Sequence, residues 1–357
     1  MVVLGIDVHK HTHTTVAVDQ VGRQLGQCTV RTNDEGCTQL LGWARATWRG
    51  DPDQRLWAVE DCRHVSGRLE RVLLAAGERV VRVPPKLTGV HRRATRTRGK
   101  SDPIDALAVA RAALADPDLP VACHDPVTRE LKLLIDHRDH LIAQRTGLIN
   151  RLRWSLHNLD PDFHIPARTL HRPANLARIR ALLAQQHATL ETRLETRLAG
   201  EHVDDIQALT QRVSDLERDL HTRVQTLCPQ LLDLPGCAHL TAAKLLAETA
   251  DITRFVTSDR YAAYAGTAPI PASSGNTHRH RLARGGNRQL NAAIHRIALT
   301  QIRIEGPGHA YYLRRQADGK TKKEAIRALK RKITRAVYQA LKTAQTDPQH
   351  AAIAPAA

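Results

Sequence analysis

The chain has 357 residues, 42% of them hydrophobic, and a formal net charge of +17. This length leaves room for two or three domains with sizeable cores, and the basic excess favours a polyanionic partner, above all nucleic acid. No run of about 18 apolar residues occurs and no cleavage-site pattern follows the apolar N-terminus, so we expect a cytoplasmic protein without a signal peptide or transmembrane helix.

The N-terminal part alternates between strand and helix patterns. Residues 2–7 form an apolar run that closes on Asp7, as in a buried central strand that carries a carboxylate to the sheet edge. The next predicted elements are strands at 14–18 and 25–30 joined by a turn at 19–22, a helix at 33–48, a strand at 56–59 ending at Glu60, a helix at 65–76 and a strand at 79–83. With a helix after Ser101, this order is that of an α/β ribonuclease-H-like domain.

The segment 100–106 predicts the start of that helix. Ser101 is a favourable N-cap, Pro103 is tolerated in a first turn, and the run from Ala106 to Leu114 continues the helix. Asp102 and Asp105, three residues apart, share one helix face. By itself this pattern also fits an ordinary helix start that carries acids.

Four carboxylates are expected to converge at one edge of the sheet, from Asp7, Glu60, Asp102 and Asp105. Such a cluster needs divalent cations to neutralise it, and Mg²⁺ fits oxygen ligands and phosphodiester chemistry. Each acid also has a simpler interpretation: Asp7 could cap a turn, and Glu60 could pair with Arg63. Asp61 is a rival ligand, although strand alternation directs it to the opposite face.

Two further groups flank the acids. His9, His11 and His13 alternate and could bind a metal if extended, but polar hairpin residues beside a nucleic-acid groove are the simpler interpretation. Just before the acid pair lies a basic strip, and we expect it to contact phosphates. Its members are Arg92, Arg93, Arg96, Arg98 and Lys100.

The middle of the chain predicts long helices. Apolar residues recur at helical spacing from 129 to 159, and again from 190 to 220 after a proline-interrupted stretch. From Ile206 to Leu220 they follow a heptad rhythm. The two helices could therefore pack on each other or on a second subunit, and we expect residues 126–228 to form a helical, coiled-coil connector between an N-terminal domain at 1–125 and a C-terminal domain at 229–345.

The start of the C-terminal domain, residues 231–240, resembles a helix-hairpin-helix, in which a Pro-Gly turn at Gly236 would hold a DNA phosphate on backbone N–H groups. An ordinary corner between two helices is the alternative. Residues 314–335 predict a basic helical surface, and residues 346–357 a disordered tail.

A Ser-Ser-Gly sequence ending at Gly275 precedes a dense basic segment. A serine there could attack a phosphate stabilised by guanidinium groups, although on spacing alone a flexible turn is the simpler interpretation. The residues expected to contact nucleic acid in this segment are Arg279, Arg281, Arg284, Asn287 and Arg288.

Together these motifs resemble the insertion sequence IS110 family of transposases, also called DEDD transposases or bridge-RNA-guided recombinases. The resemblance extends from Val3 to about Leu341 and rests on an ordered set of motifs. These are Gly5-Ile6-Asp7-Val8-His9-Lys10, Glu60, Lys100-Ser101-Asp102-Pro103-Ile104-Asp105-Ala106, Leu234-Pro235-Gly236, Tyr264-Ala265-Gly266-Thr267-Ala268-Pro269, Ser274-Gly275 and Arg284-Gly285-Gly286-Asn287.

The resemblance implies a RuvC-like N-terminal domain, a coiled-coil connector and a mainly α-helical transposase domain. It implies that Asp7, Glu60, Asp102 and Asp105 bind Mg²⁺ and that Ser274 forms a covalent phosphoserine with DNA. It also implies a homodimer or tetramer in which domains of different subunits complete one active site. A structured noncoding RNA would pair with donor and target DNA, in a prokaryotic, nucleoid-associated setting.

The sequence departs from the family pattern at two places, and Ser273 leaves the nucleophile open by one residue. Thr267 replaces a usual leucine, and Gly285-Gly286 replaces a Lys/Arg-Gly pair. Two other functions remain as alternatives. A RuvC-like nuclease or junction resolvase would hydrolyse DNA with Mg²⁺ and the acids alone, and a DNA-architectural or RNA-binding protein would use the acids only to cap helices.

Overall fold

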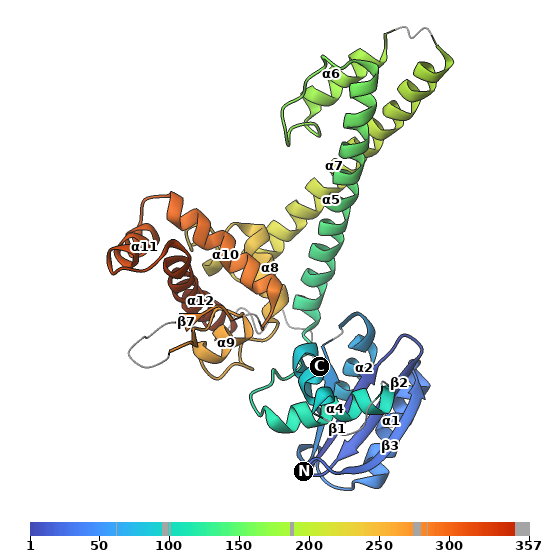
Figure 1. Cartoon of the computed structure of the whole chain (residues 1–357), viewed down its shortest axis with the longest axis vertical. Helices are drawn as coiled ribbons and strands as arrows, with labels where there is room; N and C mark the ends of the chain where they lie inside the picture. The colour runs from blue at the N-terminus through green and yellow to red at the C-terminus, as the bar shows by residue number, and fades with distance from the viewer. Residues whose placement is uncertain are drawn as a thin grey trace. The chain divides into compact units, whose positions relative to one another are not determined.

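The computed structural model describes residues 1–61, 63–94, 99, 101–185, 189–273, 280–283 and 285–346 (Figure 1). They form two compact units. Unit 1 comprises Met1–Asp125, Ala250–Tyr264 and Ala283–Gly286, and unit 2 comprises Pro126–Thr249, Ala265–Leu282 and Asn287–Ala357. The division at residue 228 stays a prediction, because unit 2 contains both the helical connector and the segment after it. The predicted disordered tail lies outside the described residues from 347 onward.

Unit 1 is built on a five-stranded mixed sheet with the order β3-β2-β1-β4-β5. Its strands are β1 (Val2–Val8), β2 (Thr12–Val18), β3 (Gln24–Arg31), β4 (Arg55–Glu60) and β5 (Arg79–Val83). β1, β2 and β3 form an antiparallel meander, whereas β4 runs parallel to β1 and β5 parallel to β4. This order and these directions are those of a ribonuclease-H-like sheet, so the predicted fold class of the N-terminal part is confirmed.

Helices cover both faces of the sheet because its central strands are apolar on both sides. One face packs on α1 (Asp34–Thr47) and α2 (Arg63–Ala75), and the other on α4 (Asp102–Ala115). The predicted cap of α1 is present, since the Asn33 side chain accepts a hydrogen bond from the Gly36 N–H. Unit 1 also contains the 3₁₀ turn η1 (Pro52–Gln54) and α9 (Ser258–Tyr264).

One helix of unit 1 was not expected. Pro84-Pro85 ends β5 as predicted, but Pro85 also opens α3 (Pro85–Arg93). Proline is compatible with the first turn of a helix, where its missing N–H would have no intrahelical partner. The basic residues 91–93 therefore form the last turn of a helix instead of an extended strip.

The backbone of α4 lies directly on β1 at Gly5. A methyl group added to Gly5 would overlap the Ala106 carbonyl oxygen and the Ala110 backbone nitrogen. Only glycine permits so close an approach between a strand and a helix. The alanines of α4 are fully buried in the same contact, at positions 106, 108 and 110. The helix start at Ser101 is thereby fixed above the carboxyl end of β1.

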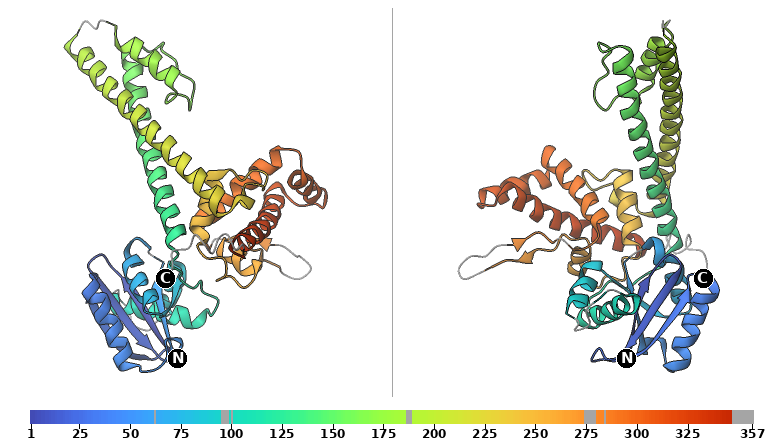
Figure 2. Two further views of the ribbon diagram at one scale, coloured as in Figure 1. Left: turned by 180° about the vertical axis from the view of Figure 1, so that it is seen from behind. Right: turned by 45° about the vertical axis from the view of Figure 1, so that its right-hand side comes forward.

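Unit 2 begins with two long helices, α5 (Pro126–Leu159) and α7 (Leu190–Leu227), that pack on each other (Figure 2). They are antiparallel, because positions late in α5 meet positions early in α7. The links are Arg223–Glu130 at 2.8 Å, Arg138–Glu217 at 2.9 Å, Arg145–Thr210 at 3.2 Å and Asn158–Glu195 at 3.0 Å. The predicted long helices are present, whereas a coiled-coil supercoil stays a prediction. α6 (Pro173–Leu183) packs against the far end of the pair.

The rest of unit 2 is mainly helical. It contains η2 (Pro229–Leu231), α8 (His239–Thr249), β6 (Ile270–Pro271), β7 (His280–Arg281), α10 (Arg288–Arg303), α11 (Pro307–Ala317) and α12 (Lys322–Thr346). Gly236 lies in the turn between η2 and α8 with φ +84°, and a Cβ there would come within 2.8 Å of Thr300 Cβ on α10. This glycine therefore has a packing role, and the helix-hairpin-helix stays a prediction. Among the described residues, no helix combines the length and apolarity needed to cross a membrane.

We predict that Gly5→Ala destabilises the protein by about 1–3 kcal/mol, because the new methyl must push α4 off the sheet. Gly42→Ala is the matched control, since a Cβ at Gly42 meets nothing within 4 Å and lies within α1. There the change should stabilise the helix by about 0.5–1 kcal/mol. Chemical denaturation of the two variants beside the wild type measures both effects, and equal stabilities would contradict the close contact.

Candidate metal centre

The acids predicted to converge come from three elements of unit 1. Along β1, residues 3, 5 and 7 point to the face covered by α4, because Val3 belongs to the core cluster with α4 and side chains alternate. On β4, Leu56 and Ala58 also face α4. Glu60 lies two residues after Ala58, so its side chain points to the same face of the sheet. Since Ile6 pairs with Val59, Asp7 and Glu60 follow side by side on neighbouring parallel strands.

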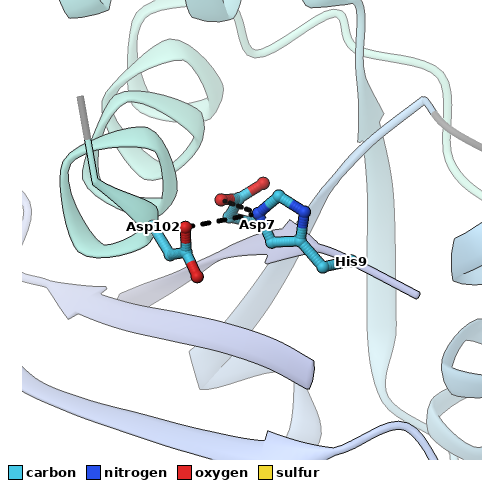
Figure 3. Close-up of side chains that lie close together, drawn as sticks. All are labelled: Asp7, His9 and Asp102. Carbon is cyan, nitrogen blue, oxygen red and sulfur yellow. Dashed lines mark hydrogen bonds and ion pairs between the residues drawn. The ribbon is translucent and has the colours of Figure 1, made fainter. Parts of the chain in front are cut away.

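The first turn of α4 brings in the other two carboxylates. His9 Nε2 lies 3.0 Å from Asp7 Oδ2 and 3.4 Å from Asp102 Oδ1, so the imidazole bridges the two acids (Figure 3). One ligand atom from each of these three residues lies within 4.8 Å of the other two. Asp7 is buried, whereas Asp102 is half exposed at 51%. The group is thus open to solvent on the Asp102 side.

Asp105 lies deeper than Asp102, with 13% of its side chain exposed, and pairs with Arg92 of α3. The Arg92 Nη1 to Asp105 Oδ1 distance is 3.0 Å. Arg92 was expected to contact nucleic acid; in the structure its guanidinium lies on the acid cluster. Arg93, by contrast, is exposed on the same helix. Arg96, Arg98 and Lys100 lie outside the described residues.

The pKa shifts of Asp7 and Glu60 show that the acids influence one another. Burial raises the pKa of Asp7; the charge of His9 opposes this, and Asp105 and Asp102 add to it. Burial also raises the pKa of Glu60, and so does the charge of Asp7, whereas Thr88 and Arg92 of α3 lower it. Mutual repulsion reaches from β1 and β4 to α4, which indicates that the four carboxylates share one environment.

The donor set fits a divalent cation. Carboxylate oxygens are hard ligands suited to Mg²⁺, Mn²⁺ or Ca²⁺, and an imidazole nitrogen is also a ligand for transition metals. His9 lies between Asp7 and Asp102, and Arg92 pairs with Asp105. A cation near these acids would reduce the repulsion between them. A cation would be held by Asp7 and Asp102, with Glu60 and Asp105 beside them.

His9 is the neighbour of the acids that sequence reasoning undervalued. The sequence signal was its position two residues after Asp7, which places both side chains on the same face of β1 and its continuation. The three-histidine metal face is not formed in the described structure, because His11 is exposed and His13 is buried in β2. Burial lowers the pKa of His13.

Ser274, the predicted nucleophile, lies outside the described residues, as do Arg279 and Arg284. Ser273, the alternative to Ser274, is exposed two residues after the end of β6, and Arg281 and Arg288 are exposed as well. Asn287 instead caps α10, accepting hydrogen bonds from the N–H groups of residues 289 and 290, and its amide donates to Glu248 at 2.6 Å.

Comparisons with known proteins cover both ends of the chain. The DEDD family model for IS110, described as a transposase, matches residues 4–161, and the model for the transposase IS116/IS110/IS902 family matches residues 228–313. A protein of insertion element IS116 from Streptomyces clavuligerus is 27% identical over 92% of each chain. A protein of insertion element IS110 from Streptomyces coelicolor is 29% identical over 65% of this chain and 68% of its own.

A solved structure was also matched. It is described as "T. thermophilus RuvC in complex with Holliday junction substrate". The match is 19% identical in sequence, covers 32% of this chain and 94% of the RuvC chain, and has a TM-score of 0.25. At that score the likeness adds nothing to the strand order and register given above.

We predict that Asp7→Asn raises the unfolding temperature at neutral pH without divalent ions. Burial raises the pKa of Asp7 in the folded protein above its usual value in the unfolded chain, so the folded protein loses stability as pH rises through the interval between these two pKa values, and the full penalty applies above the interval. Added Mg²⁺ or Mn²⁺ should stabilise the wild type and leave Asp7→Asn unchanged. Thermal unfolding with and without the ions measures both effects.

Asp61→Asn is the control for this experiment, since Asp61 adjoins Glu60 but belongs to the opposite strand face. It should retain the response to divalent ions. A loss of that response in Asp61→Asn, with Asp7→Asn still responding, would assign the cation to the rival acid.

Proposed function

The chain belongs to the IS110 family of transposases of insertion sequences, and from this we propose that it cuts and rejoins DNA through a phosphoserine intermediate with Mg²⁺ at the acid cluster. The observation that carries the proposal is the convergence of Asp7, Glu60, Asp102 and Asp105 at one sheet edge, where burial and neighbouring carboxylates raise the pKa values of Asp7 and Glu60. Such a cluster destabilises the fold unless it serves a bound cation.

The proposed reaction is a transesterification in two steps. The Ser274 hydroxyl oxygen forms a bond to a DNA phosphorus, the bond from that phosphorus to a bridging oxygen breaks, and the leaving DNA oxygen takes a proton. A second DNA hydroxyl then attacks the phosphoserine, which frees the serine and joins the strands. The number of phosphoester bonds is conserved, so no nucleotide cofactor is needed. Mg²⁺ bound by the carboxylates would stabilise charge on the phosphate oxygens.

We further propose that an element-encoded noncoding RNA selects donor and target DNA. The support is the net charge of +17 together with an aromatic content of only 3%. Charge of this kind binds phosphate backbones irrespective of sequence, and few rings are available for base stacking. Sequence choice would then come from pairing between the RNA and the DNA.

The alternative function is a Mg²⁺-dependent nuclease or junction resolvase of the RuvC type. One observation favours it: all four acids lie within unit 1, which could hydrolyse a phosphodiester without any residue of unit 2. The two functions differ in whether DNA becomes covalently attached to the protein.

We predict that wild-type protein, incubated with labelled donor and target DNA, flanking-element RNA and Mg²⁺, gives a covalent protein–DNA band in denaturing electrophoresis. Ser274→Ala should abolish this band because the attacking oxygen is missing, while RNA binding persists. Asp102→Ala should abolish it because the cation site is lost. Ser273→Ala is the matched control and should retain the band.

The opposite outcomes are distinct. Cleaved DNA without an adduct, lost only in Asp102→Ala, would establish the hydrolytic alternative. An adduct that survives in Ser274→Ala and disappears in Ser273→Ala would move the nucleophile by one residue.

We also propose self-association, as a dimer or tetramer, through the start of α7. Leu190, Leu194 and Leu198 are spaced by four residues on one face of that helix and are 77%, 49% and 43% exposed. A stripe of this kind at helical spacing is typical of a helix that packs against a partner. A coiled coil between copies would bury it.

We predict a mass above that of one 39.6 kDa chain in light scattering. Leu194→Glu should shift the protein toward the monomer, because it places a charge in the apolar contact. Val21→Glu is the control, since Val21 is 82% exposed in unit 1 and should leave the mass unchanged. A monomeric wild type would contradict self-association through this stripe.

A further inference from the structure

The described part of the β6–β7 pairing is very short. Within the described residues, β6 and β7 pair through Ile270 with Arg281 and Pro271 with His280. Ser273 is exposed two residues after Pro271, and Ser274 follows it in sequence. A two-stranded hairpin of this size is at most marginally stable alone. Other contacts must therefore fix the segments that lead into it.

Helix α12 supplies these contacts from one face. Arg327 Nη2 donates to the His280 carbonyl at 3.3 Å, on the β7 side of the hairpin. On the other side, Thr334 Oγ1 lies 2.8 Å from Thr267 Oγ1, and both threonines are buried. Residues 327, 330 and 334 are spaced by three and four, which places them in one row on the helix.

Lys330, between these two contacts, acts through Asn291 of α10. Its Nζ donates to Asn291 Oδ1 at 2.5 Å. The other end of the same amide donates to the Ala265 carbonyl at 3.0 Å and the Gly266 carbonyl at 2.8 Å. Gly266 has φ +64°, so the chain turns sharply where the amide holds it. The lysine thus orients the amide, and the amide holds the turn that leads toward β6.

Burial of the Lys330 ammonium group carries a desolvation cost. The residue is only 6% exposed, and among the described residues no carboxylate lies within ion-pair distance of its ammonium group. Burial lowers the pKa of Lys330, and its charge together with burial lowers the pKa of His295, one turn along α10 from Asn291. An apolar side chain of the same length would avoid this desolvation cost.

The Thr334 hydroxyl makes two contacts. Thr334 Oγ1 donates to the Lys330 carbonyl at 2.8 Å and lies 2.8 Å from Thr267 Oγ1, a contact in which either hydroxyl can be the donor. Thr267 stands where the family pattern has leucine, and a leucine could not make this bond. This chain therefore joins the segment before β6 to α12 by a hydroxyl contact that is particular to its own sequence.

We propose that Lys330, Asn291 and Thr334 are positioning residues that fix the β6–β7 hairpin for the serine reaction. The inference rests on the proposed function, since it is the hairpin's serine that makes its position matter. Displacement of a nucleophile by about 1 Å can slow a reaction by about 100-fold, even when the change is remote from the reacting atoms.

The first test is Lys330→Met, which keeps the length of the side chain and removes the donors. Single-turnover formation of the covalent protein–DNA adduct should slow by at least about 10-fold, while DNA affinity is kept. Lys342→Met, an exposed lysine on the same helix, is the matched control and should react at the wild-type rate.

The second test distinguishes the hydrogen bonds of the Thr334 hydroxyl from the packing of the Thr334 side chain. Thr334→Val removes the hydroxyl and keeps the shape, so adduct formation should slow. Thr334→Ser keeps the hydroxyl and should restore the wild-type rate. A role in packing alone would give the reverse order, since serine loses a methyl group that valine retains. That reversed order would overturn the proposal.

Amide hydrogen exchange gives a readout that does not depend on the chemistry. In Lys330→Met and Thr334→Val, residues 265–273 should exchange faster than in the wild type, while α5 and α7 keep their protection. Unchanged exchange in this segment together with an unchanged adduct rate would overturn the positioning role. A wild type that forms no adduct contradicts the serine mechanism instead, and faster exchange in the variants would still support the contacts proposed here.

Discussion

The contact between Gly5 and the backbone of α4 is the constraint on which the acid cluster depends. A helix normally stands off a sheet by the length of its side chains, but here the Ala106 carbonyl lies where a Cβ on β1 would be. This approach sets the height of the first helical turn above the sheet. Because Asp102 and Asp105 belong to that turn and Asp7 follows Gly5 by two residues, one packing contact fixes the separation of three carboxylates.

Charge compensation then determines which acids stay together. Without positive charge, buried carboxylates at this spacing would repel one another. Burial raises the pKa values of Asp7 and Glu60, and the charges of the neighbouring acids raise them further. The chain supplies two partners of its own, His9 between Asp7 and Asp102, and Arg92 on Asp105. A divalent cation carries more charge in less space than either side chain, so it would relieve the same repulsion more completely.

Much of this arrangement follows from the sequence, and the parts that do not have a common cause. Period-two and period-3.6 patterns give the strands, the helices and the face on which each acid lies, which is enough to bring Asp7 and Glu60 to one edge. These patterns do not predict which side chains of different elements contact one another. The bridging position of His9, the pairing of Arg92 through the unexpected α3 and the contact of Asn287 with Glu248 all depend on how separate elements pack on one another.

The two units order their chain segments by different physical means. In unit 1 the acids lie on regular strands and a helix held by backbone packing, and the side chains of His9 and Arg92 pair with them. In unit 2 the segment that leads into the two-residue strand β6 is held by an amide, a buried lysine and a pair of hydroxyls. Hydrogen bonds of this kind are directional, so they would suit the serine reaction proposed above, in which the attacking oxygen must be aimed, whereas a cation can adjust to carboxylates placed by packing.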